Sequence, residues 1–187
     1  MNVFLIFGII GIGVLAALRE PIGEAVGVDM SGGRNKQFDP LFKKYGSQYG
    51  VPWEWLAAIA ENESRTGLEK SVKRGLASPT DVEGSKSSDG KSWGLMQVTL
   101  TTAQGMDKSA TPAKLNNPEY SINLAAKFIK NLSSQFSKLE TRYMEWVIKS
   151  YNQGPGNTRS EQRTGKGYAN EYWARFQRNL EKVEAEQ

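Results

Sequence analysis

The sequence predicts a mainly α-helical protein, in which one N-terminal hydrophobic helix precedes a helical domain. Three observations support this fold class. Apolar residues recur at helical spacing along most of the chain after residue 38, and no segment alternates apolar and polar residues as the strands of a large sheet do. Residues 3–18 form an apolar run without a charged side chain. The 187 residues are enough for one ordinary domain and an appendage.

The apolar run over residues 3–18 predicts a transmembrane anchor over residues 1–19. As a helix it would span about 24 Å, against roughly 30 Å for the hydrocarbon core of a bilayer. An uncleaved or cleaved signal peptide is the alternative. No basic residue precedes the run, and no obvious small-residue cleavage site follows it, so the anchor is favoured. A buried helix of a larger assembly is a third interpretation.

Residues 20–37 are rich in Gly and polar residues, which is typical of a flexible tether. The folded domain is therefore expected to span residues 38–187.

Within this domain the helical segments follow from local signals. Asp39 and Pro40 predict the start of a first helix, because Pro is favoured in a first helical turn. Pro52 opens a second helix that is expected to run to about Ser64. The helical period then breaks over residues 65–93, which predicts a long loop in which short strands can form. The period returns in four further segments, at residues 99–105, 118–136, 140–151 and 168–183.

The residue types restrict the chemistry. The chain has no Cys and no His, which excludes a Ser-His-Asp triad and metal sites built on these ligands. Acid–base work near neutral pH would fall to a carboxyl, Lys or Tyr with a shifted pKa. The net charge of +4 suits a polyanionic partner, but the basic residues are scattered and no recognition motif for nucleic acid is present. We therefore expect no nucleic-acid partner.

One carboxylate lies on an unexpected face of the second predicted helix. Glu63 shares the apolar face of Leu56 and Ile59. Glu61 lies on the opposite face, where it can pair with Arg65 four residues further on. An apolar environment raises the pKa of a carboxyl group because desolvation disfavours the charged form, and the C-terminal end of a helix acts in the same direction. Glu63 is thus a candidate general acid. The alternative is a partly buried Glu tied to a basic neighbour.

Four short blocks then follow one another in a family-specific order. They are Glu63-Ser64 at the end of the apolar helix, Gly-Leu-Met-Gln at 94–97, Leu-Asn-Asn-Pro-Glu at 115–119, and Ser-Tyr-Asn-Gln-Gly-Pro-Gly-Asn at 150–157. Together they resemble the soluble lytic transglycosylase domain of the lysozyme-like superfamily, over about residues 38–180. The resemblance implies a lysozyme-like, mainly α transglycosylase domain.

The resemblance also implies a role for each matching residue. Glu63 matches the single catalytic acid/base of the family, and Ser64 matches the Ser that supports it. Substrate-binding roles fall to Met96, Gln97, Tyr151, Asn152 and, by a looser match to the last motif, Tyr168. No metal and no cofactor are implied.

The implied activity is cleavage of the β-1,4 bond between N-acetylmuramic acid and N-acetylglucosamine in peptidoglycan, with closure of a 1,6-anhydro ring. The chain departs from the family in the loop at residues 65–93, which is about twice the usual length. Asp81 or Asp89 in this loop could supply a second carboxylate, and hydrolysis by a lysozyme-type mechanism is then the alternative. A non-catalytic wall-binding assembly protein is the other alternative.

An anchor joined to such a domain predicts a membrane-anchored enzyme that faces the periplasm and the cell wall. Its expected partners are the glycan strands of peptidoglycan and, through residues 3–18, a lipid membrane. Attachment to a virion or its membrane, or to a larger envelope assembly that opens the wall locally, is an alternative setting.

Overall fold

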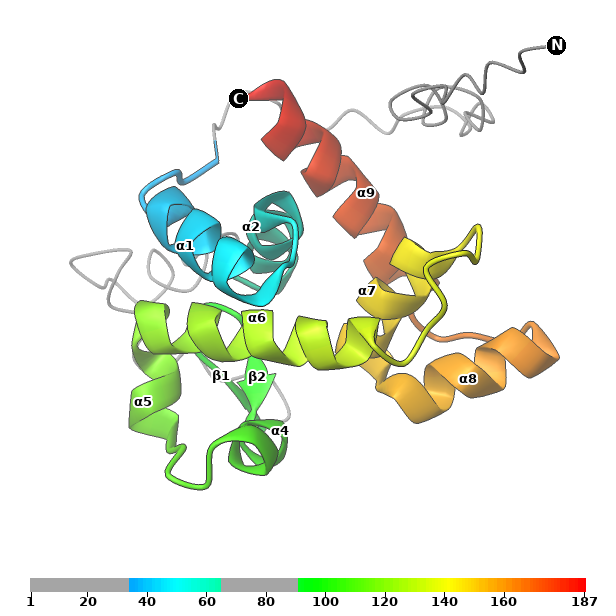
Figure 1. Ribbon diagram of the computed structural model, residues 1–187, viewed down its shortest axis with the longest axis horizontal. Helices are drawn as coiled ribbons and strands as arrows, with labels where there is room; N and C mark the ends of the chain where they lie inside the picture. The colour runs from blue at the N-terminus through cyan, green and yellow to red at the C-terminus, as the bar shows by residue number, and fades with distance from the viewer. Residues whose placement is uncertain (1–33, 65–90) are drawn as a thin grey trace, which may run out of the picture. The chain divides into compact units, whose positions relative to one another are not determined.

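The computed structural model describes residues 34–64 and 91–187, which belong to one compact unit (Figure 1). This unit is mainly helical, as the sequence predicts. Its elements are α1 (Asp39–Tyr49), α2 (Trp53–Ser64), β1 (Ser92–Trp93), β2 (Val98–Thr99), α4 (Leu100–Met106), α5 (Pro112–Asn116), α6 (Pro118–Ser133), α7 (Tyr143–Gln153), α8 (Pro155–Thr164) and α9 (Asn170–Ala185).

The predicted anchor and most of the predicted tether lie outside the described residues. Within residues 34–64 and 91–187, no helix is long and apolar enough to cross a bilayer. The end of the predicted tether belongs to the folded unit, because the buried Arg34 donates two hydrogen bonds to Asp39 (2.5 and 2.7 Å) and lies 3.6 Å from Glu186. A buried guanidinium requires such carboxylates. Arg34 is thus part of the described unit.

The first two helices begin and end close to the predicted positions. Pro40 lies in the first turn of α1, and Gly50 ends this helix in the left-handed conformation, with φ of +64°. α2 begins one residue after Pro52 and ends at Ser64.

α2 is the central helix of the fold. It contacts α1, α6 and α9 (Figure 1), and five consecutive residues in it are fully buried: Leu56, Ala57, Ala58, Ile59 and Ala60. The face opposite Leu56, on which Glu61 lies, is also largely covered. Ala58 on that face is 0% exposed and Glu61 is only partly exposed, because α9 packs against α2. A helix buried all round has little freedom to rotate.

α6 runs across the middle of the fold, with α1 and α2 on one side and the hairpin, α4 and α5 on the other (Figure 1). The hairpin is a short antiparallel pair in which Ser92 lies opposite Thr99 and Trp93 lies opposite Val98. Its turn contains the Gly-Leu-Met-Gln block at 94–97.

The four later predicted segments are helical in the structure, as α4, α6, α7 and α9, with ends shifted by at most three residues. Two helices were not predicted, α5 and α8. α5 is only one turn and a half, and α8 buries only two residues, Thr158 and Glu161, which are both polar. A helix without an apolar stripe gives no periodic signal in the sequence.

Candidate active site

Glu63 lies in the last turn of α2 and faces a cleft of about 420 Å³. Polar side chains without charge line much of this cleft, among them Ser92, Gln97, Thr99, Thr102, Asn152 and Gln153. Phe128 and Tyr151 add an aromatic pair, with ring centroids 5.5 Å apart. Among the described residues that line the cleft, Glu63 alone carries a carboxyl group. The described part of the chain also contains no group of three or more acidic residues placed to hold a metal ion.

A tyrosine from α9 binds the Glu63 carboxyl group directly. The Tyr172 hydroxyl donates a hydrogen bond of 2.7 Å to Glu63 Oε1, and its side chain is 4% exposed. Burial and the nearby Glu63 charge raise the pKa of Tyr172 well above its usual value. The hydroxyl therefore keeps its proton and remains a donor to the carboxyl group.

Two asparagines hold Tyr172 in this place. The Asn62 side chain, next to Glu63 on α2, donates to the backbone carbonyl of Tyr172 at 3.1 Å. Asn179, nearly two turns further along α9, donates to the side-chain oxygen Oδ1 of Asn62 at 2.6 Å. These bonds fix the register of α9 against α2, so that the tyrosine hydroxyl reaches the end of α2.

A second tyrosine approaches from α7. The Tyr151 hydroxyl donates to the backbone carbonyl of Met96 at 2.8 Å. Burial, and then the Glu63 charge, raise the pKa of Tyr151 well above its usual value. Tyr151 thus joins α7 to the turn of the hairpin and forms part of the cleft wall.

Two serine hydroxyl groups hold the turn of the hairpin through hydrogen bonds. Ser64 is buried, and its hydroxyl donates to the Leu95 carbonyl at 2.8 Å. The Met96 N–H donates to the Ser121 hydroxyl at 3.2 Å. Gly94 has φ of +74°, and a Cβ there would lie 1.8 Å from the Leu115 carbonyl oxygen, so only Gly fits.

Gln97 completes the turn with an uncommon backbone conformation, because its φ is +47°. Its side-chain amide donates to the Gly94 carbonyl at 2.8 Å. The turn therefore presents Gln97 to the cleft in a fixed orientation.

The structure brings together four of the seven residues selected from the sequence, since Glu63, Gln97, Tyr151 and Asn152 all line the cleft. Ser64 lies beneath the turn and is 2% exposed. Met96 is 0% exposed and lies in the core, so its backbone carbonyl, and not its side chain, serves the site.

Tyr168 is placed differently from the expectation. Its side chain is 88% exposed and is not part of the cleft lining. Tyr172, four residues later, was missed and is the tyrosine that contacts Glu63. The signal for Tyr172 was its spacing from Phe176, since both lie on the buried face of α9. Helical periodicity appeared to include Tyr168 as well, but α9 begins only at Asn170.

Comparison with known families agrees with this geometry. A family model described as the transglycosylase SLT domain matches residues 40–174, more than half of the chain. A search of curated proteins gives no match. The family match includes all of the cleft residues and indicates lytic transglycosylase activity on peptidoglycan. This chain belongs to the transglycosylase SLT domain family.

Proposed function

We propose that this domain cleaves the β-1,4 bond between N-acetylmuramic acid and N-acetylglucosamine, with Glu63 as acid and then base. The observation that carries this proposal is the cleft itself. It contains a single carboxyl group among its described lining residues, and a buried tyrosine hydroxyl donates to that group at 2.7 Å. One carboxyl is sufficient when the nucleophile is a hydroxyl of the substrate, whereas hydrolysis usually uses two.

In the first step, Glu63 protonates the glycosidic oxygen, and the bond from this oxygen to C1 of the muramic ring breaks. The N-acetyl group of the same sugar stabilises the positive charge at C1. Glu63 is now a carboxylate, and the Tyr172 hydroxyl at 2.7 Å stabilises it. A hydrogen bond to a charged group contributes about 1.5–3 kcal/mol.

In the second step, the Glu63 carboxylate removes the proton of the 6-hydroxyl of the same muramic ring, and the oxygen attacks C1. The 1,6-anhydro ring closes, and Glu63 regains its proton. No water is consumed. The amides of Gln97 and Asn152 suit the hydroxyl and N-acetyl groups of the sugars, and the ring of Phe128 suits their apolar faces.

The test is digestion of purified peptidoglycan, with product masses as the readout. Wild-type protein should release muropeptides that end in 1,6-anhydro-muramic acid, about 18 Da lighter than hydrolysis products because one water is not added. Glu63→Gln should release none, while Glu61→Gln, two residues earlier on α2, should retain the activity. Reducing-end products would show a lysozyme and direct attention to Asp81 and Asp89. Release by the Glu63→Gln variant would refute the assignment of Glu63.

We also propose that residues 3–18 attach the domain to a membrane beside the wall, where it opens the wall locally. The apolar run in the sequence supports this proposal. The full chain and a chain that starts at Arg34 can be compared by flotation with phospholipid vesicles. The full chain should float with the vesicles and the shorter chain should not. Equal behaviour of the two chains would refute the anchor.

A further inference from the structure

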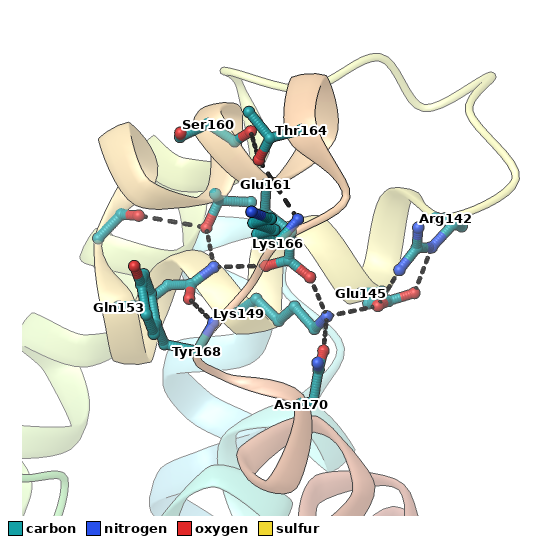
Figure 2. Close-up of polar contacts among 12 residues, drawn as sticks. Arg142, Glu145, Lys149, Gln153, Ser160, Glu161, Thr164, Lys166, Tyr168 and Asn170 are labelled. Atoms are coloured by element: carbon teal, nitrogen blue, oxygen red, sulfur yellow. Dashed lines mark hydrogen bonds and ion pairs between the residues drawn. The ribbon is translucent and has the colours of Figure 1, made fainter.

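A buried lysine on α7 has no part in the chemistry described above. Lys149 is 1% exposed and is surrounded by oxygen atoms: Glu161 Oε1 at 2.5 Å, Asn170 Oδ1 at 2.5 Å and Glu145 Oε1 at 2.8 Å (Figure 2). Glu145 in turn forms an ion pair with Arg142. Removal of an ammonium group from water costs several kcal/mol, and these partners offset that cost.

The partners of Lys149 come from three helices. Glu145 and Lys149 lie on α7, Glu161 on α8, and Asn170 is the first residue of α9 (Figure 2). α8 buries only Thr158 and Glu161, so no buried apolar side chain attaches it to the rest of the domain. The ion pair from Lys149 to Glu161 therefore takes the place that an apolar stripe has in an ordinary helix.

The second oxygen of Glu161 connects this cluster to the cleft. Glu161 Oε2 accepts a hydrogen bond of 2.8 Å from the side-chain amide of Gln153, which lines the cleft. The same amide donates to Thr158 Oγ1 at 3.1 Å, and its oxygen accepts the backbone N–H of Tyr168 at 3.2 Å. Gln153 is thus held by Glu161, Thr158 and Tyr168, and its orientation depends on Glu161.

At Gly167 the backbone lies directly against the Glu161 carboxylate. A Cβ at this position would lie 2.0 Å from Glu161 Cδ and 2.2 Å from each of its carboxylate oxygens. The segment before α9 therefore packs directly on the Glu161 carboxylate, and it leaves that carboxylate no alternative position on this side.

We propose that Lys149 is a positioning residue for the active site, an inference that rests on the proposed function. It ties together the helices that present the groups around Glu63. α7 carries Tyr151 and the cleft residue Gln153, and α9 carries Tyr172 two residues after Asn170. Loss of the cluster releases these elements from one another, and a displacement of about 1 Å among catalytic groups can reduce a rate by about 100-fold.

The first test removes both charges together, in the double variant Lys149→Met/Glu161→Met. Glu145 keeps Arg142 as its partner, and substitution of a whole buried ion pair by apolar side chains is often neutral for stability. We expect kcat for release of muropeptides to fall about 10- to 100-fold, with KM and the melting temperature nearly unchanged. Lys130→Met, the same substitution at an exposed position of α6, is the control and should behave as wild type.

A second variant keeps every charge and disturbs the cluster sterically. Gly167→Ala places its methyl group against Glu161 and should lower kcat in the same way, whereas Gly105→Ala, which meets nothing within 4 Å, should not. Because this variant keeps both charged side chains, it still tests the proposal if the double variant fails to fold. Wild-type kcat in a folded variant of either kind would overturn the proposal.

Failure of the proposed function is distinguishable from failure of this inference. If wild-type protein released no muropeptide, the function would be wrong, and hydrogen exchange would then test the positioning role. Backbone amides at residues 150–154 and 168–172 should exchange faster in both variants, with no change in α1. Unchanged exchange in these segments would overturn the inference whatever the activity of the protein.

Discussion

The most informative single change is Tyr172→Phe, because it removes one oxygen atom from the site and little else. Phe keeps the aromatic ring, which is buried where α9 packs against α2. The only group lost is the hydroxyl that donates to Glu63 Oε1 at 2.7 Å. Since the Tyr172 side chain is 4% exposed, water has little access to replace this donor.

The size of the effect follows from the role of the bond. Glu63 gains negative charge as it protonates the glycosidic oxygen, so the bond is stronger in the transition state than in the ground state. A hydrogen bond contributes about 1.5–3 kcal/mol when one partner is charged and about 0.5–1.5 kcal/mol when both are neutral, so the bond strengthens by about 1–1.5 kcal/mol. At about 1.4 kcal/mol for each tenfold change in rate, kcat should fall roughly 5- to 12-fold. KM should change little, because the substrate keeps its contacts with the cleft.

The assay is the initial rate of release of anhydro-muropeptides over a range of peptidoglycan concentrations. Tyr168→Phe is the matched control, since it is the same substitution on a tyrosine that is 88% exposed, four residues earlier. Tyr168→Phe should retain wild-type kcat. If both variants retained it, the hydroxyl at Glu63 would have no catalytic role. If Tyr168→Phe alone lost activity, the assignment of the two tyrosines would be reversed.

Three further predictions concern stability. Gly94→Ala forces φ of +74° on an L-residue and drives a methyl group into the Leu115 carbonyl, so urea unfolding should show a loss of at least about 2 kcal/mol. Ser64→Ala leaves a buried carbonyl in the hairpin turn without its donor and should cost about 1–3 kcal/mol in the same experiment. Hydrogen bonds, first from the Ser109 hydroxyl, lower the pKa of Asp107 from 3.8 to about 2. The stability contributed by its carboxylate is therefore present above pH 3.8 and is lost as the pH falls toward 2. Asp107→Asn should melt below wild type at pH 7, and the two curves should converge near pH 2.

Most of the helices could be predicted because they have one apolar stripe that faces one core. α6 buries Ile122, Leu124, Ile129 and Leu132 along such a stripe, and its start at Pro118 is marked in the sequence. α8 could not be predicted for the opposite reason. Its buried groups are a Thr and a Glu, which pair with side chains of α7, and such pairing has no period in the sequence of α8 itself.

The candidate site was predicted where a motif fixes both the residue and the backbone around it. Glu63 and Gln97 are of this kind, since the end of α2 and a turn that accepts only Gly at position 94 place them. Met96 was expected to bind substrate, but its side chain is buried in the core and its backbone carbonyl accepts a hydrogen bond from Tyr151. A sequence motif does not distinguish a residue that acts through its backbone from one that acts through its side chain. Tyr172 was missed because the last motif was matched only loosely. The matched stretch, residues 167–172, contains both tyrosines, and the first of them was selected.

The burial of α2 bears on the mechanism as well as on the fold. In the proposed reaction one carboxyl group must reach two oxygens in turn, first the glycosidic oxygen and then the 6-hydroxyl. Glu63 stands at the end of a helix with five consecutive buried residues, and Tyr172 holds its Oε1. The carboxyl group therefore has little freedom to travel between the two positions. In the proposed reaction the two oxygens therefore come in turn to a carboxyl group that stays in place, beside the cleft residues of α4, α6 and α7.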